Sequence, residues 1–171
     1  MDIFVVRKLG VPGREELAMG AIAPGGLRVL NHDVLSYLHV PERLIDEVAA
    51  RETVELERRQ RLYRGERGEP EVRGRTVILV DDGLATGSSM RAAIAALRQK
   101  QPAAIVAAVP VAAPETCAEL RGEVDDIVCA VTPPVFSAVS LWYEDFSQTT
   151  DAEVRELFER AASRRLPVAE H

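Results

Sequence analysis

The chain has 171 residues, of which 47% are hydrophobic, with a net charge of −6 and an isoelectric point near 5.2. The length and hydrophobic content suit one domain over residues 1–171, and the acidic charge argues against a general nucleic-acid binder. No apolar run is long enough to span a membrane and no secretory signal is visible, so we expect a cytoplasmic protein that binds neither membranes nor nucleic acid.

The N-terminal part of the chain predicts short strands followed by one long helix. Residues 3–6 are an apolar strand candidate, and residues 17–23 and 27–30 flank Pro24-Gly25-Gly26 as the arms of a β-hairpin. Residues 41–63 predict a helix, because Glu and Arg recur four residues apart and neither Gly nor Pro interrupts the run. A polar loop is expected at residues 65–74.

Two cations, Arg7 and Lys8, follow the first predicted strand at its carboxyl end. The Arg7 guanidinium is a planar fork suited to phosphate oxygens, and the Lys8 ammonium is a point charge, so both are candidate ligands of an anion. A solvated strand end is the alternative. For Arg58, Arg59 and Arg61 on the long helix, a solvated face is the favoured interpretation over anion binding.

Residues 77–90 carry the strongest functional signal. The apolar residues 77–80 predict a buried parallel strand covered on both faces, and apolar residues recur at helical spacing from Met90 onward. Asp81 and Asp82 end the strand, and a loop of small residues follows. Hydroxyl and N–H groups at a helix start suit a phosphate, and paired acids at a strand end suit sugar hydroxyls, or Mg²⁺ held directly or through water. The candidate phosphate-binding residues are Ala85, Thr86, Gly87, Ser88 and Ser89. The alternative is an ordinary strand–turn–helix with a solvated acid pair and a Ser/Thr helix cap.

The second half of the chain predicts alternating strands and helices. Strands are expected at residues 103–109 and 124–131, with a short helix at 114–120 between them. Thr150 and Glu153 form a capping box for an amphipathic final helix with a basic end at Arg164-Arg165. We interpret Cys117 and Cys129 as small buried residues, and not as a disulfide or a metal-binding pair.

Aromatic residues make up only 5% of the chain, yet several gather between residues 133 and 146. Phe136, Trp142 and Tyr143 could form a stacking wall for a planar base. A hydrophobic plug under the sheet explains the same cluster equally well.

The run Val77-Ile78-Leu79-Val80-Asp81-Asp82-Gly83-Leu84-Ala85-Thr86-Gly87 resembles the signature of type I phosphoribosyltransferases, which bind 5-phosphoribosyl 1-pyrophosphate (PRPP). The resemblance implies an α/β fold with an open, mostly parallel sheet flanked by helices, a small β-hairpin and a helical flap. It implies that residues 85–89 hold the 5-phosphate, and that Asp81 and Asp82 contact the ribose hydroxyls with Mg²⁺ as cofactor. Arg7 and Lys8 would then meet pyrophosphate. Residues 5–10, 16–21 and 142–150 also resemble a bacterial branch usually labelled predicted phosphoribosyltransferase.

The implied activity is transfer of the phosphoribosyl group of PRPP to a nitrogenous base or amine, which the sequence does not identify, with release of pyrophosphate. The strand and pyrophosphate loop with which the family usually begins, often Pro-Arg-Gly-Gly in this branch, have no match, so we expect an N-terminally incomplete domain. A missing strand would expose apolar surface and favour a homodimer. A regulatory module that binds PRPP or a nucleotide without turnover is the alternative function.

Overall fold

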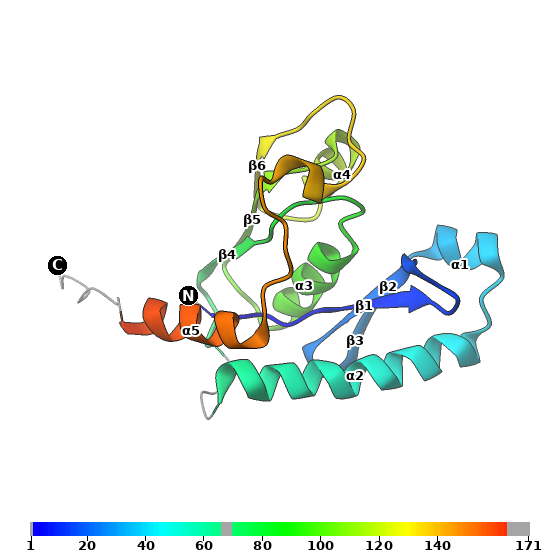
Figure 1. Ribbon diagram of the computed structural model, residues 1–171, viewed down its shortest axis with the longest axis horizontal. Helices are drawn as coiled ribbons and strands as arrows, with labels where there is room; N and C mark the ends of the chain where they lie inside the picture. The colour runs from blue at the N-terminus through cyan, green and yellow to red at the C-terminus, as the bar shows by residue number, and fades with distance from the viewer. Residues whose placement is uncertain (1, 66–69, 164–171) are drawn as a thin grey trace.

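A computed structural model describes residues 2–65 and 70–163 (Figure 1). Part of the loop expected at 65–74, and the Arg164-Arg165 end of the final helix, lie outside these residues. The elements in chain order are β1 Arg7–Val11, β2 Arg14–Ala23, β3 Leu27–Leu30, α1 His32–Leu38, α2 Glu42–Arg64, β4 Thr76–Val80, α3 Ser88–Gln99, β5 Ala104–Val111, α4 Pro114–Leu120, β6 Asp126–Val131 and α5 Asp151–Ser163, with 3-10 turns at Pro24–Gly26 and Val139–Trp142.

The strands form two separate three-stranded sheets. Strands β1, β2 and β3 pair antiparallel in that order, and β4, β5 and β6 pair parallel in that order. Helices α3 and α4 connect the parallel strands, which gives two successive β–α–β units. The predicted α/β class and hairpin are therefore confirmed, with the hairpin turn made possible by the positive φ of 82° at Gly25.

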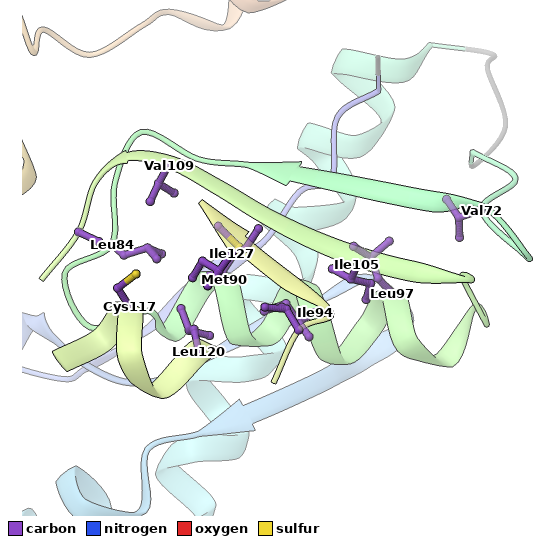
Figure 2. Packing of buried hydrophobic residues seen from close by; sticks show 13 residues of the cluster. Val72, Leu84, Met90, Ile94, Leu97, Ile105, Val109, Cys117, Leu120 and Ile127 are labelled. Atoms are coloured by element: carbon purple, nitrogen blue, oxygen red, sulfur yellow. The ribbon is translucent and has the colours of Figure 1, made fainter. Parts of the chain in front are cut away.

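Helix α3 lies between the two sheets and packs against both (Figure 1). Its face with Met90, Ile94 and Leu97 meets the parallel sheet, and Figure 2 shows these side chains pointing at the strands. Its other face carries small residues, Ala92 and Ala96, which pack against alanines of β2 and let the helix approach that sheet closely. Burial on two sides fixes the position of α3.

Helix α2 covers the other face of the antiparallel sheet. Ile45, Val48 and Leu56 pack against a cluster that includes Leu9 and Met19 of that sheet. The outward side is charged, as expected for a solvated helix face. Glu55 pairs with Arg58 at 2.7 Å and Arg59 at 2.8 Å, and Glu57 lies 3.9 Å from Arg61. Arg58 also reaches Asp151 of α5, at 3.4 Å. Of the described helices, none is long and apolar enough to cross a membrane.

Two local predictions differ from the structure. Residues 3–6 are not a strand, because their backbone pairs with no other strand in the described part of the chain, although Phe4 and Val6 still pack beside α3. Helix α1 was not predicted. It begins at the Asn31 cap, whose side chain accepts a hydrogen bond from Val34 N at 3.2 Å, a short polar signal that the hairpin prediction obscured.

The expectation that β4 is covered on both faces is met on one face only. Val77 and Leu79 pack against the core, whereas Ile78 and Val80 are 66% and 69% exposed on the opposite face. In the described part of the chain, no helix covers this face. Formation of a homodimer stays a prediction.

The cysteine prediction was wrong in one respect. Cys117 of α4 and Cys129 of β6 are joined by a disulfide, with their Cα atoms 6.8 Å apart. The β5–α4–β6 crossover lays α4 against the sheet and so brings the two side chains together, which spacing along the sequence does not reveal. Cys117 is buried, as expected, and Cys129 is half-buried.

Truncation of two isoleucines on neighbouring strands tests the one-sided burial of the parallel sheet. Ile105 is fully buried, so Ile105→Ala should lower the free energy of unfolding by about 2–5 kcal/mol. Ile78→Ala is the matched control on the open face and should lower it by only about 0.5 kcal/mol. Chemical denaturation measures both values. Equal losses would show that the face of Ile78 is covered in solution.

Candidate functional site

Strand β4 delivers two carboxylates to the edge of the parallel sheet. Asp81 and Asp82 follow its last residue, and both are exposed. The Asp82 N–H donates to Asp81 Oδ1 at 3.0 Å. Although Asp81 as a residue is exposed, the protein around its carboxylate displaces water and raises its pKa; the Asp82 N–H opposes this rise and the Asp82 charge adds to it. Two acids crowded in this way suit a ligand that brings hydroxyl donors or a cation.

The chain after the acids is clamped to the end of β5. Gly83 has no room for a side chain, because a Cβ there would lie 2.7 Å from Val139 Cγ1. Leu84 is buried, its N–H donates to Val111 O at 2.9 Å, and its carbonyl accepts from Ala113 N at 2.8 Å. These contacts fix where the following loop starts.

The loop from Ala85 to Ser89 turns into α3 through Gly87, whose φ of 70° is the left-handed conformation that favours glycine. The Thr86 and Ser88 hydroxyl oxygens are 3.1 Å apart. Within the described residues, the backbone N–H groups of Thr86, Gly87 and Ser89 have no protein acceptor. Unpaired donors at the positive end of a 12-residue helix form an anion-binding arrangement.

Two side chains from outside the loop bind its carbonyl groups. Thr116 Oγ1, on α4, donates to Ala85 O at 2.6 Å. Arg91 Nη1, on α3, donates to Thr86 O at 2.9 Å. Sequence reasoning missed Thr116, because its helix precedes the last strand and lies far from the motif along the chain.

The acids and the loop line one cavity of about 290 Å³. Its wall runs continuously from Asp81 to Met90 and is completed by Val139. A larger cavity of about 420 Å³ lies beside it, between the β2–β3 hairpin with α1 and the side chains of Thr86, Ser88 and Arg91. The predicted acid pair and phosphate loop are thus brought together around one space.

The two predicted cations are not among the described residues that line the 290 Å³ cavity. Arg7 forms a two-pronged ion pair with Glu52 of α2, through Nε at 3.0 Å and Nη2 at 2.7 Å. Lys8 is exposed on β1. A pyrophosphate role for either residue stays a prediction.

The aromatic candidates lie near the acid pair without lining its cavity. The Tyr143 hydroxyl donates to Asp82 O at 2.6 Å, and its ring packs on Phe146 with centroids 5.1 Å apart. Trp142 is 45% exposed and Phe136 is half-buried. Tyr143 therefore holds the backbone of the acid pair, whereas base stacking by these three residues stays a prediction.

The donor set fits Mg²⁺ only in part. Among the described residues, no group of three or more His, Cys, Asp or Glu side chains gathers as a metal site. Asp81 and Asp82 can supply carboxylate oxygens, and Mg²⁺ commonly completes its shell with water and ligand phosphates. The acids therefore suit a metal that arrives with a phosphorylated ligand.

Residues 13–142 match the phosphoribosyl transferase domain, which includes the β4–α3 turn and most of the elements around it. The chain belongs to this family of phosphoribosyl transferase domains.

Relatives support the same assignment. The chain is 41% identical over 161 residues to "Putative phosphoribosyl transferase Rv0571c" and "Putative phosphoribosyl transferase MT0597", from two strains of Mycobacterium tuberculosis. The match covers 94% of this chain and 36% of each relative, so the chain spans about a third of their length. The crystal structure of TT1426 from Thermus thermophilus is 39% identical with a TM-score of 0.72, over 93% of this chain and 75% of that one.

Replacing Asp81 with Asn should stabilise the fold at neutral pH. Because the folded-state pKa of Asp81 lies above its ordinary value, the folded protein binds this proton more tightly, and ionised Asp81 destabilises the fold. Asp81→Asn should raise the free energy of unfolding at pH 7, and the gain should shrink as pH falls through the carboxylate range. Denaturation curves from acidic to neutral pH measure this. A loss of stability that is the same at every pH would mean that Asp81 is a structural acceptor.

Proposed function

We propose that the chain binds PRPP at the β4–α3 turn and transfers its phosphoribosyl group to a nitrogen nucleophile, with release of pyrophosphate. Family membership supports a phosphoribosyltransferase in general. The observation that carries the proposal is the single cavity lined both by the loop at the start of α3 and by Asp81 and Asp82. A phosphate and a sugar joined to each other fit two such adjacent sites.

The 5-phosphate would lie on the loop. The N–H groups of Thr86, Gly87 and Ser89 would donate to its oxygens, and the Thr86 and Ser88 hydroxyls are within reach of the same space. The helix terminus adds favourable partial charge. Backbone donors of this kind need no lysine, and the loop contains none.

The ribose would lie over the acid pair. Its hydroxyl groups would donate to the Asp81 and Asp82 carboxylates, which are otherwise crowded against each other. Mg²⁺, when bound with PRPP, would neutralise part of the pyrophosphate charge, with Asp81 and Asp82 as the protein ligands.

The reaction forms one bond and breaks one at ribose C1. The lone pair of the acceptor nitrogen forms the N–C1 bond, and the C1–O bond breaks with its electron pair leaving on pyrophosphate. The acceptor nitrogen then loses a proton. Positive charge develops on the ribose in between, as in glycoside cleavage, and the Asp81 and Asp82 carboxylates would stabilise it. No covalent intermediate with the protein is required.

A second candidate function is binding of PRPP or a nucleotide without turnover. The observation that favours it is the Arg7–Glu52 ion pair, which occupies the cation expected at the pyrophosphate. A single domain over residues 1–171, a homodimer and a cytoplasmic location stay predictions of the sequence.

A valine at Gly87 should abolish phosphate binding. A Cβ there would lie 2.9 Å from Thr116 Cγ2, and the branched side chain would stand in the loop where the backbone approaches the ligand. We expect a loss of affinity for ribose 5-phosphate of roughly tenfold or more by calorimetry. Gly74→Val is the matched control, because Gly74 has a similar φ of 67° with nothing within 4 Å of its Cβ position. Equal affinity of the wild type and Gly87→Val would place the phosphate elsewhere.

Pyrophosphate release distinguishes the two candidate functions. The wild type should release pyrophosphate from PRPP in the presence of Mg²⁺ and one member of a panel of purines, pyrimidines and amines. Asp82→Asn should lower the rate by about 10²–10³, the usual loss when one charge-stabilising group is removed. Tight binding of PRPP with no release for any acceptor would favour the regulatory module.

A further inference from the structure

We infer that Thr116 and Arg91 are positioning residues that set the direction of the N–H groups in the loop from Ala85 to Ser89. This inference rests on the proposed function, because it explains how that loop is prepared for a phosphate. Neither side chain needs to touch the ligand for this role. Both act on the loop by binding its carbonyl oxygens.

Thr116 holds the first of these carbonyls from α4. Its side chain is buried, at 8% exposure, and its hydroxyl donates to Ala85 O at 2.6 Å. Its methyl carbon faces Gly87 so closely that a Cβ there would lie 2.9 Å away. The same side chain therefore binds the loop by a hydrogen bond and packs against its tightest point.

Arg91 holds the second carbonyl and is itself held in place. Nη1 donates to Thr86 O at 2.9 Å, while Nη2 reaches Glu119 at 2.7 Å and Nε reaches Glu123 at 2.8 Å. Glu119 lies on α4 and Glu123 shortly after it. The guanidinium thus fastens α3, the loop and the α4 segment to one another through all three of its nitrogens.

The geometry of the peptide group turns these contacts into a direction for the donors. In a planar trans peptide, the C=O and N–H groups point to opposite sides, and no cis peptide occurs among the described residues. Ala85 C=O shares its peptide with Thr86 N–H, and Thr86 C=O shares its peptide with Gly87 N–H. Holding the two carbonyls toward α4 and Arg91 therefore aims the two N–H groups the opposite way.

Loss of one of these contacts should weaken phosphate binding without removing any group that touches the ligand. Without Thr116 Oγ1, the Ala85 carbonyl would turn toward water and carry Thr86 N–H away from the phosphate. The free protein would then have to reorder the loop when the ligand binds. A hydrogen bond to a buried partner is commonly worth about a tenfold change in an equilibrium constant.

The test is calorimetric titration of ribose 5-phosphate into three variants and the wild type. Thr116→Val keeps the shape of the side chain and removes its hydroxyl, so affinity should fall about tenfold. Thr116→Ser restores the hydroxyl and should bind within about threefold of the wild type. Thr53→Val is the matched control, because the Thr53 hydroxyl also donates to a backbone carbonyl, Ala49 O at 2.7 Å, but on α2. It should leave affinity unchanged.

A purely structural role would lower the melting temperature of Thr116→Val and leave its affinity at the wild-type value, which would overturn the inference alone. Failure of the wild type to bind ribose 5-phosphate would overturn the proposed function and this inference with it. If Thr116→Val does not fold, Arg91→Gln replaces it, with Arg98→Gln of the same helix as its control. Arg98 lies in the last turn of α3, at the end opposite the loop, and pairs with Asp125 at 2.9 Å. Equal affinity of Arg91→Gln and Arg98→Gln would also overturn the inference.

Discussion

The fixed position of helix α3 between two sheets is the constraint on which the site depends. Its large apolar residues face the parallel sheet and its alanines face the antiparallel one, so the helix cannot shift without opening one of the two contacts. The loop at its start inherits this position, because Gly87 leads directly into the first helical turn. A rigid scaffold with a short loop at its end is how folds of this kind place donors for a ligand.

The same end of the sheet also carries a charge in an unfavourable place. Asp81 lies where burial disfavours its ionised form, and it is crowded by Asp82. Tyr143 and Val139, from the segment after β6, hold the backbone around these acids. Strained or desolvated groups persist in a fold when the surrounding structure overdetermines them, and such groups cluster at functional sites.

Much of the fold could be predicted because its signals are local. The hairpin around Pro24–Gly26, helix α2 and the strand–loop–helix at β4 are each marked by residues next to one another in the chain. The open face of β4, the Cys117–Cys129 disulfide and the contacts of Thr116 arise from segments far apart in the sequence. Composition and periodicity carry no information on such pairings. For the same reason, Arg7 could be recognised as an anion ligand candidate, but its ion pair with Glu52 of α2 could not be foreseen.

The most direct test of the central claim, that the N–H groups at the start of α3 bind the phosphate, is a backbone amide NMR titration with ribose 5-phosphate. The amides of Thr86, Gly87 and Ser89 should show the largest shifts and move downfield, because their N–H groups would donate to a charged acceptor. The amides of the antiparallel sheet should stay in place. Saturable shifts that avoid this loop and gather elsewhere, for example around Arg7, would contradict the claim.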